Sequence, residues 1–367
     1  VKIDKDGNVT AGCQKERCKW GYPSFHKKLV GEYPKSPKQH IEPSTEAEEL
    51  SEMSGLHWTT TKQGKDLLVA NLHNVATYLT NKNLPIWYDS FLRKIKYEDL
   101  DTGEVGNWED KQTLKLTKHL QQYEGLRRIG RDIVDQGVSL YAFSKERNEL
   151  REYLDSLEWD GQRRLDTWLS DYCGAVSSPF VREAGRCWLL GAVARAYQPG
   201  TKFDHMLVLE GEQGLGKSTV FEILAGSWFD ELGKFDGKDS AEKLAGVWIV
   251  EIPELAGLKK SDVETVKSFL TVRSDRYRPP YGRRVEEYPR TCVLGGTTNA
   301  DTYLNDSTGN RRFWPIKCEY IEIEDLRRDR DQLLAEAVER YQQGWSLLLS
   351  EEARKEAQDA QENRYAQ

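Results

Sequence analysis

Apolar residues recur at helical spacing through much of the first 200 positions. Leu72, Val75, Ala76 and Leu79 stand at positions i, i+3, i+4 and i+7, which is the stripe that one face of a helix buries. The same periodicity predicts further helices over 110–123, 132–153, 163–172 and 180–197. A short strand pair is predicted within 83–101, on either side of Asp89-Ser90. We therefore expect a mainly helical domain over residues 61–200.

From Phe203 onward, strands alternate with helices. Short apolar runs predict strands at 206–210, 247–252, 291–297 and 312–316. Such alternation is typical of a parallel sheet covered by helices on both faces. We predict an α/β core with a parallel central sheet over 201–320 and a helical C-terminal segment over 321–367. Residues 1–60 are polar and weakly periodic, and we expect a partly disordered arm there.

Composition and charge exclude several classes of protein. The chain has 367 residues, which is long enough for two or three structural units. Its 11 Trp and 17 Tyr are more than a disordered chain would carry. No run of about 18 apolar residues is present, so we expect no membrane partner. The six scattered cysteines suit a reducing cytoplasm.

Two of these cysteines raise the question of a metal. Cys13 and Cys18, with His26 and His40 downstream, offer the residue types of a zinc site. Their loose spacing and the lack of a second cysteine pair favour ordinary thiols instead.

A phosphate-binding motif lies between the first predicted strand of the core and the helix after it. Gly211, Gly216, Lys217 and Ser218 fit G-x-x-x-x-G-K-[ST] in register. Glycines let backbone N–H groups turn onto the β-phosphate. Lys217 is expected to reach the β- and γ-phosphates, and the Ser218 hydroxyl to bind Mg²⁺. ATP and Mg²⁺ are thus the expected cofactors, and the expected nucleotide-binding residues are Gly211, Gln213, Gly214, Gly216, Lys217, Ser218 and Thr219.

Two further predicted strands end in residues that suit phosphate chemistry. A P-loop enzyme needs a carboxylate at the end of a neighbouring strand to hold Mg²⁺ and polarise the attacking water. An apolar run leads into Glu251, and Glu254 follows after Pro253. We place Glu251 on the metal and Glu254 as a candidate base. The next strand ends at Asn299, which we predict to sense the γ-phosphate and the lytic water.

Arginines supply the remaining candidates. Arg311 or Arg312 can act as an arginine finger on the γ-phosphate bound by a neighbouring subunit, which can raise the rate of hydrolysis about 10³–10⁵-fold. Alternatively, both arginines are a solvated pair beside a core strand. Residues 271–290 hold six Arg against three acidic residues, a net of +3 in a chain of net charge −7. Arginines with interleaved tyrosines hold single strands, and a solvated hairpin is the alternative. The predicted DNA contacts are Arg278, Tyr281, Arg283 and Arg284.

In order, these motifs resemble the superfamily 3 helicase core of the AAA+ class, and more closely the virulence-associated E family of phages and mobile chromosomal islands. The resemblance covers about residues 71–350. It includes Trp159-Asp160-Gly161 before the P-loop, Glu251-Ile252-Pro253-Glu254-Leu255, and Arg311-Arg312-Phe313-Trp314. It implies an AAA+-type P-loop core in a hexameric ring, inside a bacterial host cell.

On this resemblance the ring couples ATP hydrolysis to movement on single-stranded or forked DNA during replication of the element. Lys217 and Ser218 then bind phosphate and Mg²⁺, Glu251 and Glu254 form the acidic motif, and Asn299 is the sensor. Arg311 or Arg312 acts across the subunit boundary, and Arg283 and Arg284 lie on a DNA-facing hairpin. A primase or initiator is a further partner that the resemblance suggests.

A second hypothesis remains open beside the helicase. The chain can instead be a partner-switched AAA+ ATPase, such as an initiator, a loader or a regulator, that does not unwind nucleic acid. Its net negative charge and the helical region 71–200, as a docking module, leave room for this hypothesis. A rate of ATP turnover that does not change when DNA is added would distinguish this hypothesis from the helicase. A helicase acting on RNA is a third hypothesis that the sequence does not separate from the first.

Overall fold

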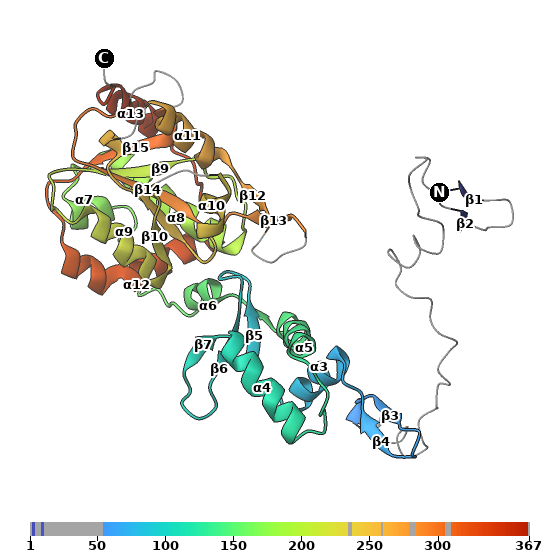
Figure 1. Cartoon of the computed structure of the whole chain (residues 1–367). Coiled ribbons are helices and arrows are strands. Elements are labelled where there is room, and N and C mark those ends of the chain that lie inside the picture. The colour runs from blue at the N-terminus through green and yellow to red at the C-terminus, as the bar shows by residue number, and fades with distance from the viewer. Residues whose placement is uncertain are drawn as a thin grey trace. The chain divides into compact units, whose positions relative to one another are not determined.

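The computed structural model describes residues 2–3, 9–10, 54–233, 237–257, 260–278, 284–304 and 310–365. The chain divides into two compact units (Figure 1). The N-terminal unit comprises residues up to 84 together with 109–141, and the core unit comprises 85–108 and 142 to the end. Most of the arm expected over 1–60, including Cys13 and Cys18, lies outside the described residues.

From residue 54 onward, the N-terminal unit contains a β-hairpin and three helices. Asn71 begins the first predicted helix, where its side chain accepts a hydrogen bond from the Asn74 N–H. Val75 and Leu79 of that helix are fully buried, as predicted, whereas Leu72 is partly exposed. The elements are β3 (Trp58–Thr60), β4 (Asp66–Leu68), α3 (Leu72–Asn81), α4 (Asp110–Gln122) and α5 (Arg131–Phe143).

A five-stranded parallel sheet is the centre of the core unit, which confirms the predicted α/β class with a parallel sheet. The strand order is β10-β11-β14-β9-β15. The edge strand β10 was not predicted from the sequence, because its three residues are too few to form a pattern. The strands are β9 (Met206–Glu210), β10 (Phe229–Glu231), β11 (Ile249–Ile252), β14 (Val293–Thr298) and β15 (Phe313–Lys317).

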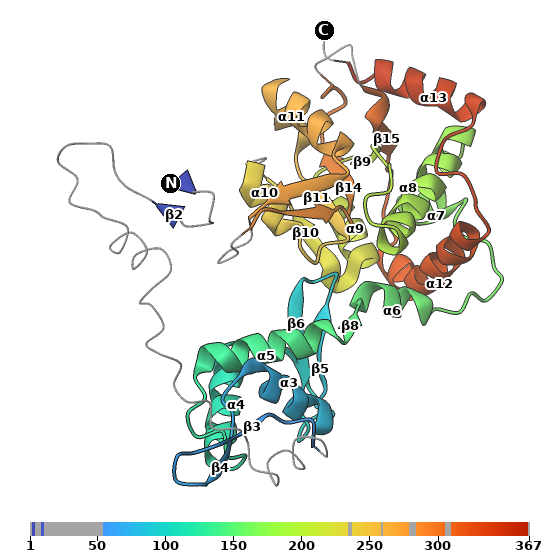
Figure 2. The same cartoon turned by 90° about the vertical axis from the view of Figure 1, so that its right-hand side faces the viewer.

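Helices cover both faces of this sheet (Figure 2). One apolar cluster joins β9 and β15 to α7, α8, α9, α12 and α13, and a second joins the opposite face to α11. The helices are α6 (Glu149–Asp155), α7 (Trp168–Cys173), α8 (Pro179–Tyr197), α9 (Lys217–Ala225), α10 (Gly237–Lys243), α11 (Lys260–Thr271), α12 (Ile323–Gln342) and α13 (Glu351–Glu362). Short 3₁₀ turns are η1 (Gly226–Trp228), η2 (Leu255–Gly257) and η3 (Asn310–Arg312).

The expected division into domains differs from the observed one. Residues 61–200 do not form one domain, since 85–108 and 142–200 belong to the core unit. Helix α8 shows the reason: it is buried on nearly every side, and its Trp188 donates a hydrogen bond of 2.8 Å to the Leu294 carbonyl of β14. A helix that is apolar all round has to lie inside a larger core. The C-terminal helices α12 and α13 likewise pack on α8 and are not a separate segment.

Smaller sheets complete the core unit, and one of them interrupts a predicted helix. The helix expected over 132–153 is wrong in its middle, because α5 ends at Phe143 and the short strand β8 (Glu146–Arg147) follows it. Asn148 then begins α6, where its side chain accepts a hydrogen bond of 2.9 Å from the Arg151 N–H. The strands of the core unit are β5 (Ile86–Asp89), β6 (Lys94–Glu98), β7 (Val105–Asn107) and β8 (Glu146–Arg147) in one sheet, and β12 (Ser274–Tyr277) and β13 (Glu286–Pro289) in a hairpin. Strands β1 (Lys2–Ile3) and β2 (Val9–Thr10) pair within the N-terminal unit.

Across the described part of the chain, no helix combines the length and the apolar character needed to cross a bilayer.

Candidate nucleotide-binding site

The glycine-rich motif forms the turn between β9 and α9, as its sequence context predicts. Gly214 and Gly216 have φ angles of 82° and 98°, a left-handed region that residues with a Cβ rarely adopt. A Cβ added at Gly216 would also stand 3.1 Å from Ile323 Cδ1, at the start of α12. Both glycines are therefore required by the shape of the loop, which ends where Lys217 opens the helix.

Lys217 lies beneath this loop and is 6% exposed. Its ammonium donates hydrogen bonds to the Gly211 and Glu212 carbonyls, at 2.8 and 2.7 Å, and to Asn299 Oδ1 at 2.9 Å. Burial lowers the pKa of Lys217 from its ordinary value. The predicted phosphate-binding lysine and the predicted sensor are thus in direct contact.

Glu251 is the buried carboxylate of the site. It lies on β11, is fully buried, and its Oε1 accepts hydrogen bonds from Ser218 Oγ at 2.7 Å and from Thr297 Oγ1 at 2.6 Å. Burial raises the pKa of Glu251, and the two hydroxyl donors act in the opposite direction. Its Oε2 has no hydrogen-bond partner among the described residues. A buried carboxylate oxygen without a partner, beside a hydroxyl, fits the oxygen ligands that Mg²⁺ prefers.

The order of the strands brings these residues together. Strand β14 lies between β9 and β11, with Thr298 opposite Glu210 and Gly295 opposite Glu251. All three strands are parallel, so their carboxyl ends meet at one edge of the sheet, where ligands bind in such sheets. Thr297 was part of the predicted strand but was not assigned a role from the sequence. Its only signal was its position two residues before Asn299.

Glu254, the other predicted acidic residue, has a different environment. It is exposed and follows the end of β11 with a left-handed φ of 51°. No hydrogen bond of its side chain to another described residue is seen. The structure therefore brings Glu251 to Ser218 and leaves Glu254 facing solvent, with no contact to the P-loop.

The two candidate finger arginines lie at the opposite edge of the sheet from the P-loop. They belong to η3, directly before β15, and Phe313 of β15 pairs with Met206 at the start of β9. The P-loop follows Glu210 at the other end of β9, roughly 13 Å along the strand. Arg311 is exposed and Arg312 is half-buried. Neither arginine is brought to the P-loop of its own chain.

The predicted basic hairpin is present as β12 and β13, which pair in antiparallel register. Arg278 and Arg284 are exposed at its described end. The other two predicted DNA contacts, Tyr281 and Arg283, lie outside the described residues.

Several charged side chains of the hairpin form ion pairs within the protein. Arg290 is 2% exposed and forms a two-pronged ion pair with Asp275, at 2.8 and 2.9 Å. Arg276 pairs with Glu287 at 2.9 Å. Tyr277, which the sequence suggested as a stacking ring, is buried and accepts a hydrogen bond of 2.7 Å from Arg93. The basic patch open to a ligand is therefore smaller than its sequence suggested.

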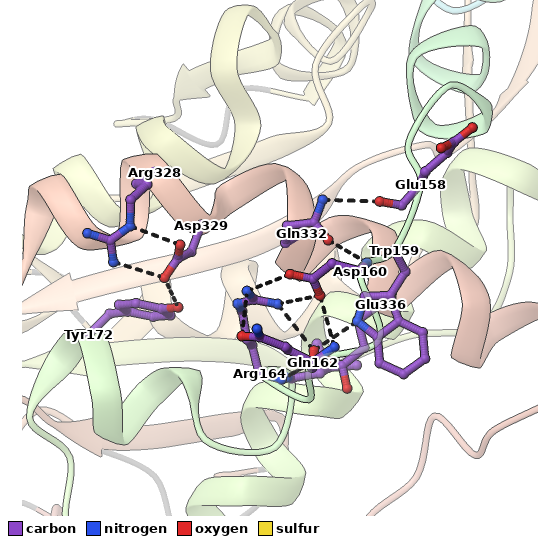
Figure 3. A network of polar contacts seen from close by, with 11 residues as sticks. Glu158, Trp159, Asp160, Gln162, Arg164, Tyr172, Arg328, Asp329, Gln332 and Glu336 are labelled. Carbon is purple, nitrogen blue, oxygen red and sulfur yellow. Dashed lines mark hydrogen bonds and ion pairs between the residues drawn. The ribbon is translucent and has the colours of Figure 1, made fainter.

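The turn Trp159-Asp160-Gly161 and the residues after it are hydrogen-bonded to α12 (Figure 3). Glu336 Oε2 accepts hydrogen bonds from the Arg164 and Leu165 N–H groups, at 2.6 and 2.8 Å. Gln332 Oε1 accepts one from the Asp160 N–H at 2.8 Å. This network replaces the first half of the helix expected over 163–172, because α12 supplies the hydrogen-bond partners that a helix would have provided. The turn positions α12, whose first residue lies against the P-loop.

Comparison with known proteins identifies the family. The family model described as the virulence-associated protein E-like domain matches residues 154–366, which is more than half of the chain. The chain therefore belongs to the virulence-associated protein E-like family, and the resemblance seen in the sequence is confirmed. No curated protein matches the chain.

Solved structures show a weak similarity. The A form apo structure of the NrS-1 C terminal region has a TM-score of 0.48 at 13% identity, covering 78% of this chain and 74% of that one. Another apo structure of the NrS-1 C terminal region has a TM-score of 0.45 at 12% identity, covering 78% and 74%. These similarities do not bear on function.

Replacing Glu251 by glutamine is expected to leave nucleotide binding intact and to lower ATP turnover by about 10²–10³-fold. The amide keeps the shape of the carboxyl group but lacks the charge that a metal needs. Because burial raises the pKa of Glu251, protons compete with Mg²⁺ at a higher pH than for an exposed glutamate. The Mg²⁺ concentration for half-maximal turnover of the wild type should therefore rise as the pH is lowered.

Magnesium titrations of ATP turnover at several pH values measure this effect. Glu254→Gln is the comparison from the same motif: it removes an exposed carboxylate, and it should lower the rate of turnover without changing the Mg²⁺ concentration for half-maximal turnover. A larger loss of Mg²⁺ dependence in Glu254→Gln than in Glu251→Gln would contradict the placement of the metal on Glu251.

Proposed function

We propose that this protein is an ATP-dependent motor of the AAA+ type that moves on single-stranded DNA as a helicase or translocase. The observation that carries the proposal is the hydrogen-bonded set at one edge of the sheet, in which Lys217 contacts Asn299 and Ser218 contacts Glu251. Phosphate-binding, sensing and metal-binding groups from three parallel strands are in register there. Membership of a family linked with mobile elements supports a role in the replication of such an element.

In this proposal each side chain acts on a different part of bound ATP. Lys217 exchanges its loop carbonyls for phosphate oxygens, which are stronger acceptors because they are charged. Ser218 and Glu251 hold Mg²⁺, which when bound neutralises charge that develops on the β- and γ-phosphates. Asn299 moves between Lys217 and the γ-phosphate, and thereby reports whether that phosphate is present. Glu254, exposed after the strand, is the group proposed to orient the attacking water.

The proposed assembly is a ring, with six subunits as the expected number. Arg311 lies at the edge of the sheet away from its own P-loop, so it can serve only the nucleotide of another subunit. Head-to-tail contact between copies joins opposite edges of the same protein and closes into a ring. Arg278, Tyr281, Arg283 and Arg284 are proposed to face DNA from the hairpin. A primase or initiator remains a proposed partner.

One observation favours a second function. The buried Tyr277 and the paired Arg276 and Arg290 leave the described hairpin with few free cations. A partner-switched ATPase, such as an initiator, loader or regulator, would keep the same nucleotide site and need no DNA track. The two functions differ in whether DNA changes the rate of ATP turnover.

We expect single-stranded DNA to raise ATP turnover several-fold, and Arg278→Ala/Arg284→Ala to remove most of that rise while leaving the basal rate unchanged. The physical reason is that exposed cations bind the phosphate backbone, whereas the nucleotide site lies at another edge of the sheet. Steady-state ATPase assays with and without oligothymidine or oligouridine measure the effect, and the second oligomer tests RNA. Turnover that is real but indifferent to both would favour the partner-switched ATPase.

A further inference from the structure

A concentration of positive charge lies in the N-terminal unit, in a part of the chain that contains none of the nucleotide motifs. Residues 111–131 contain Lys111, Lys115, Lys118, Arg127, Arg128 and Arg131. Against these six cations stands one acidic residue, Glu124, which gives a net of +5 in a chain whose net charge is −7. A stretch of the same length that includes much of the hairpin, 265–285, carries the same net charge of +5.

Helix α4 arranges three of these cations as a stripe. Lys111, Lys115 and Lys118 stand at positions i, i+4 and i+7, so they share one face of the helix. All three are exposed, and they extend over roughly 10 Å of the helix axis. The opposite face of α4 is buried through Leu116 and Leu120. The packing of the helix therefore fixes the direction in which the lysines point.

These lysines have no acidic partners among the described residues. The ion pairs of the region are Arg131 with Asp110 and His119 with Glu124, and neither involves the stripe. Arg127 and Arg128, in the turn after α4, are exposed as well and form no ion pair in the described part of the chain. Five neighbouring cations are thus open to an anionic ligand.

An exposed aromatic ring stands at the end of the stripe. Tyr123 ends α4 and is 74% exposed, in contrast to Tyr277 of the hairpin at 7%. Its ring lies 5.3 Å from that of His119. Cations that hold a phosphate backbone beside a ring on which a base stacks are the two parts of a single-strand binding site.

We propose that α4 and the turn after it form a binding surface for single-stranded DNA, with Lys111, Lys115 and Lys118 on phosphates and Tyr123 stacked on a base. An acidic protein segment would also be attracted by the lysines, but it would leave the exposed ring without a role. The surface is distinct from the hairpin, and its binding of DNA requires no ATP hydrolysis. It therefore goes beyond the proposed motor function.

The test is the affinity of the full chain for a fluorescent oligothymidine of about 30 nucleotides, longer than typical single-strand sites, measured without ATP over a range of salt concentrations. Lys111→Gln/Lys115→Gln/Lys118→Gln should bind about tenfold more weakly or worse. The slope of log affinity against log salt should fall by about 2, since each lost phosphate contact contributes about 0.7 on a single strand.

Two matched controls separate the surface from general charge and from misfolding. Lys62→Gln/Lys65→Gln/Lys82→Gln removes the same charge from exposed positions in the same unit, and it should bind as the wild type does. Tyr123→Ala should lose about tenfold in affinity while Tyr123→Phe keeps it, because stacking needs the ring and not the hydroxyl. Basal ATP turnover should be unchanged in all of these variants.

Each result decides one of the two proposals. The α4 surface would be overturned if the two triple lysine variants lost DNA affinity equally, or if neither lost any. Loss of binding only in Arg278→Ala/Arg284→Ala would also overturn it, and would leave the motor proposal standing. Binding through α4 together with ATP turnover that ignores DNA would support the surface and contradict the motor.

Discussion

Replacing Lys217 by alanine is expected to lower ATP turnover by about 10³-fold or more. The ammonium is buried under the loop and its three acceptors, two loop carbonyls and Asn299, mark where phosphate oxygens would stand. Among the described residues, Lys217 is the only cation that these hydrogen bonds hold under the loop, and the alanine variant lacks it. Because little covalent chemistry is done by the protein in phosphoryl transfer, loss of such a charge acts directly on the rate.

Single-turnover and steady-state ATPase assays measure the change. Lys267→Ala is the matched control, since Lys267 is 5% exposed and pairs with Glu264 on α11, outside the site. A comparable loss of turnover in both variants, at unchanged nucleotide binding, would mean that removing a buried lysine, and not a phosphate contact, was responsible.

Arg311→Ala is expected to lower turnover by about 10³-fold, the lower end of the effect of an arginine finger. The arginine lies before β15 at the edge of the sheet opposite the P-loop, so its effect has to pass between subunits. Arg312→Ala should have a smaller effect on turnover, because Arg312 is half-buried whereas Arg311 is exposed. The sequence had left the two arginines equivalent.

Mixing two inactive variants tests the direction of this contact. In an equal mixture of Lys217→Ala and Arg311→Ala chains, about one quarter of the subunit boundaries pair an intact P-loop with an intact arginine. Part of the turnover should therefore return on mixing, and size-exclusion chromatography should show a shared oligomer. A mixture that forms oligomers yet stays inactive would rule out Arg311 as a finger acting between subunits.

The hairpin and unit boundaries show where the sequence pattern was insufficient. The sequence predicted a hairpin here, because turn residues act locally, and β12 and β13 pair in antiparallel register. It did not show that Asp275 and Glu287 neutralise two of the arginines, or that Arg93 holds Tyr277. Those partners come from other strands or from distant positions in the chain. The same reason explains why 85–108 and 142–200 were assigned to a helical domain instead of the core unit.

The nucleotide-binding loop was determined by the sequence alone. Its glycines, Lys217 and Ser218 act through spacing within one turn, and the left-handed angles at Gly214 and Gly216 follow from local steric limits on the backbone. The strands were also predictable, because burial on both faces requires continuous apolar runs.

Only the tertiary structure decided which distant residues complete the site. Chain order does not give strand order, and it is the insertion of β14 between β9 and β11 that brings Asn299 to Lys217 and Thr297 to Glu251. The parallel pairing of β15 with β9 likewise places Arg311 at the opposite edge of the sheet from the P-loop. These are long-range pairings, fixed by how the sheet assembles and not by any neighbouring residue.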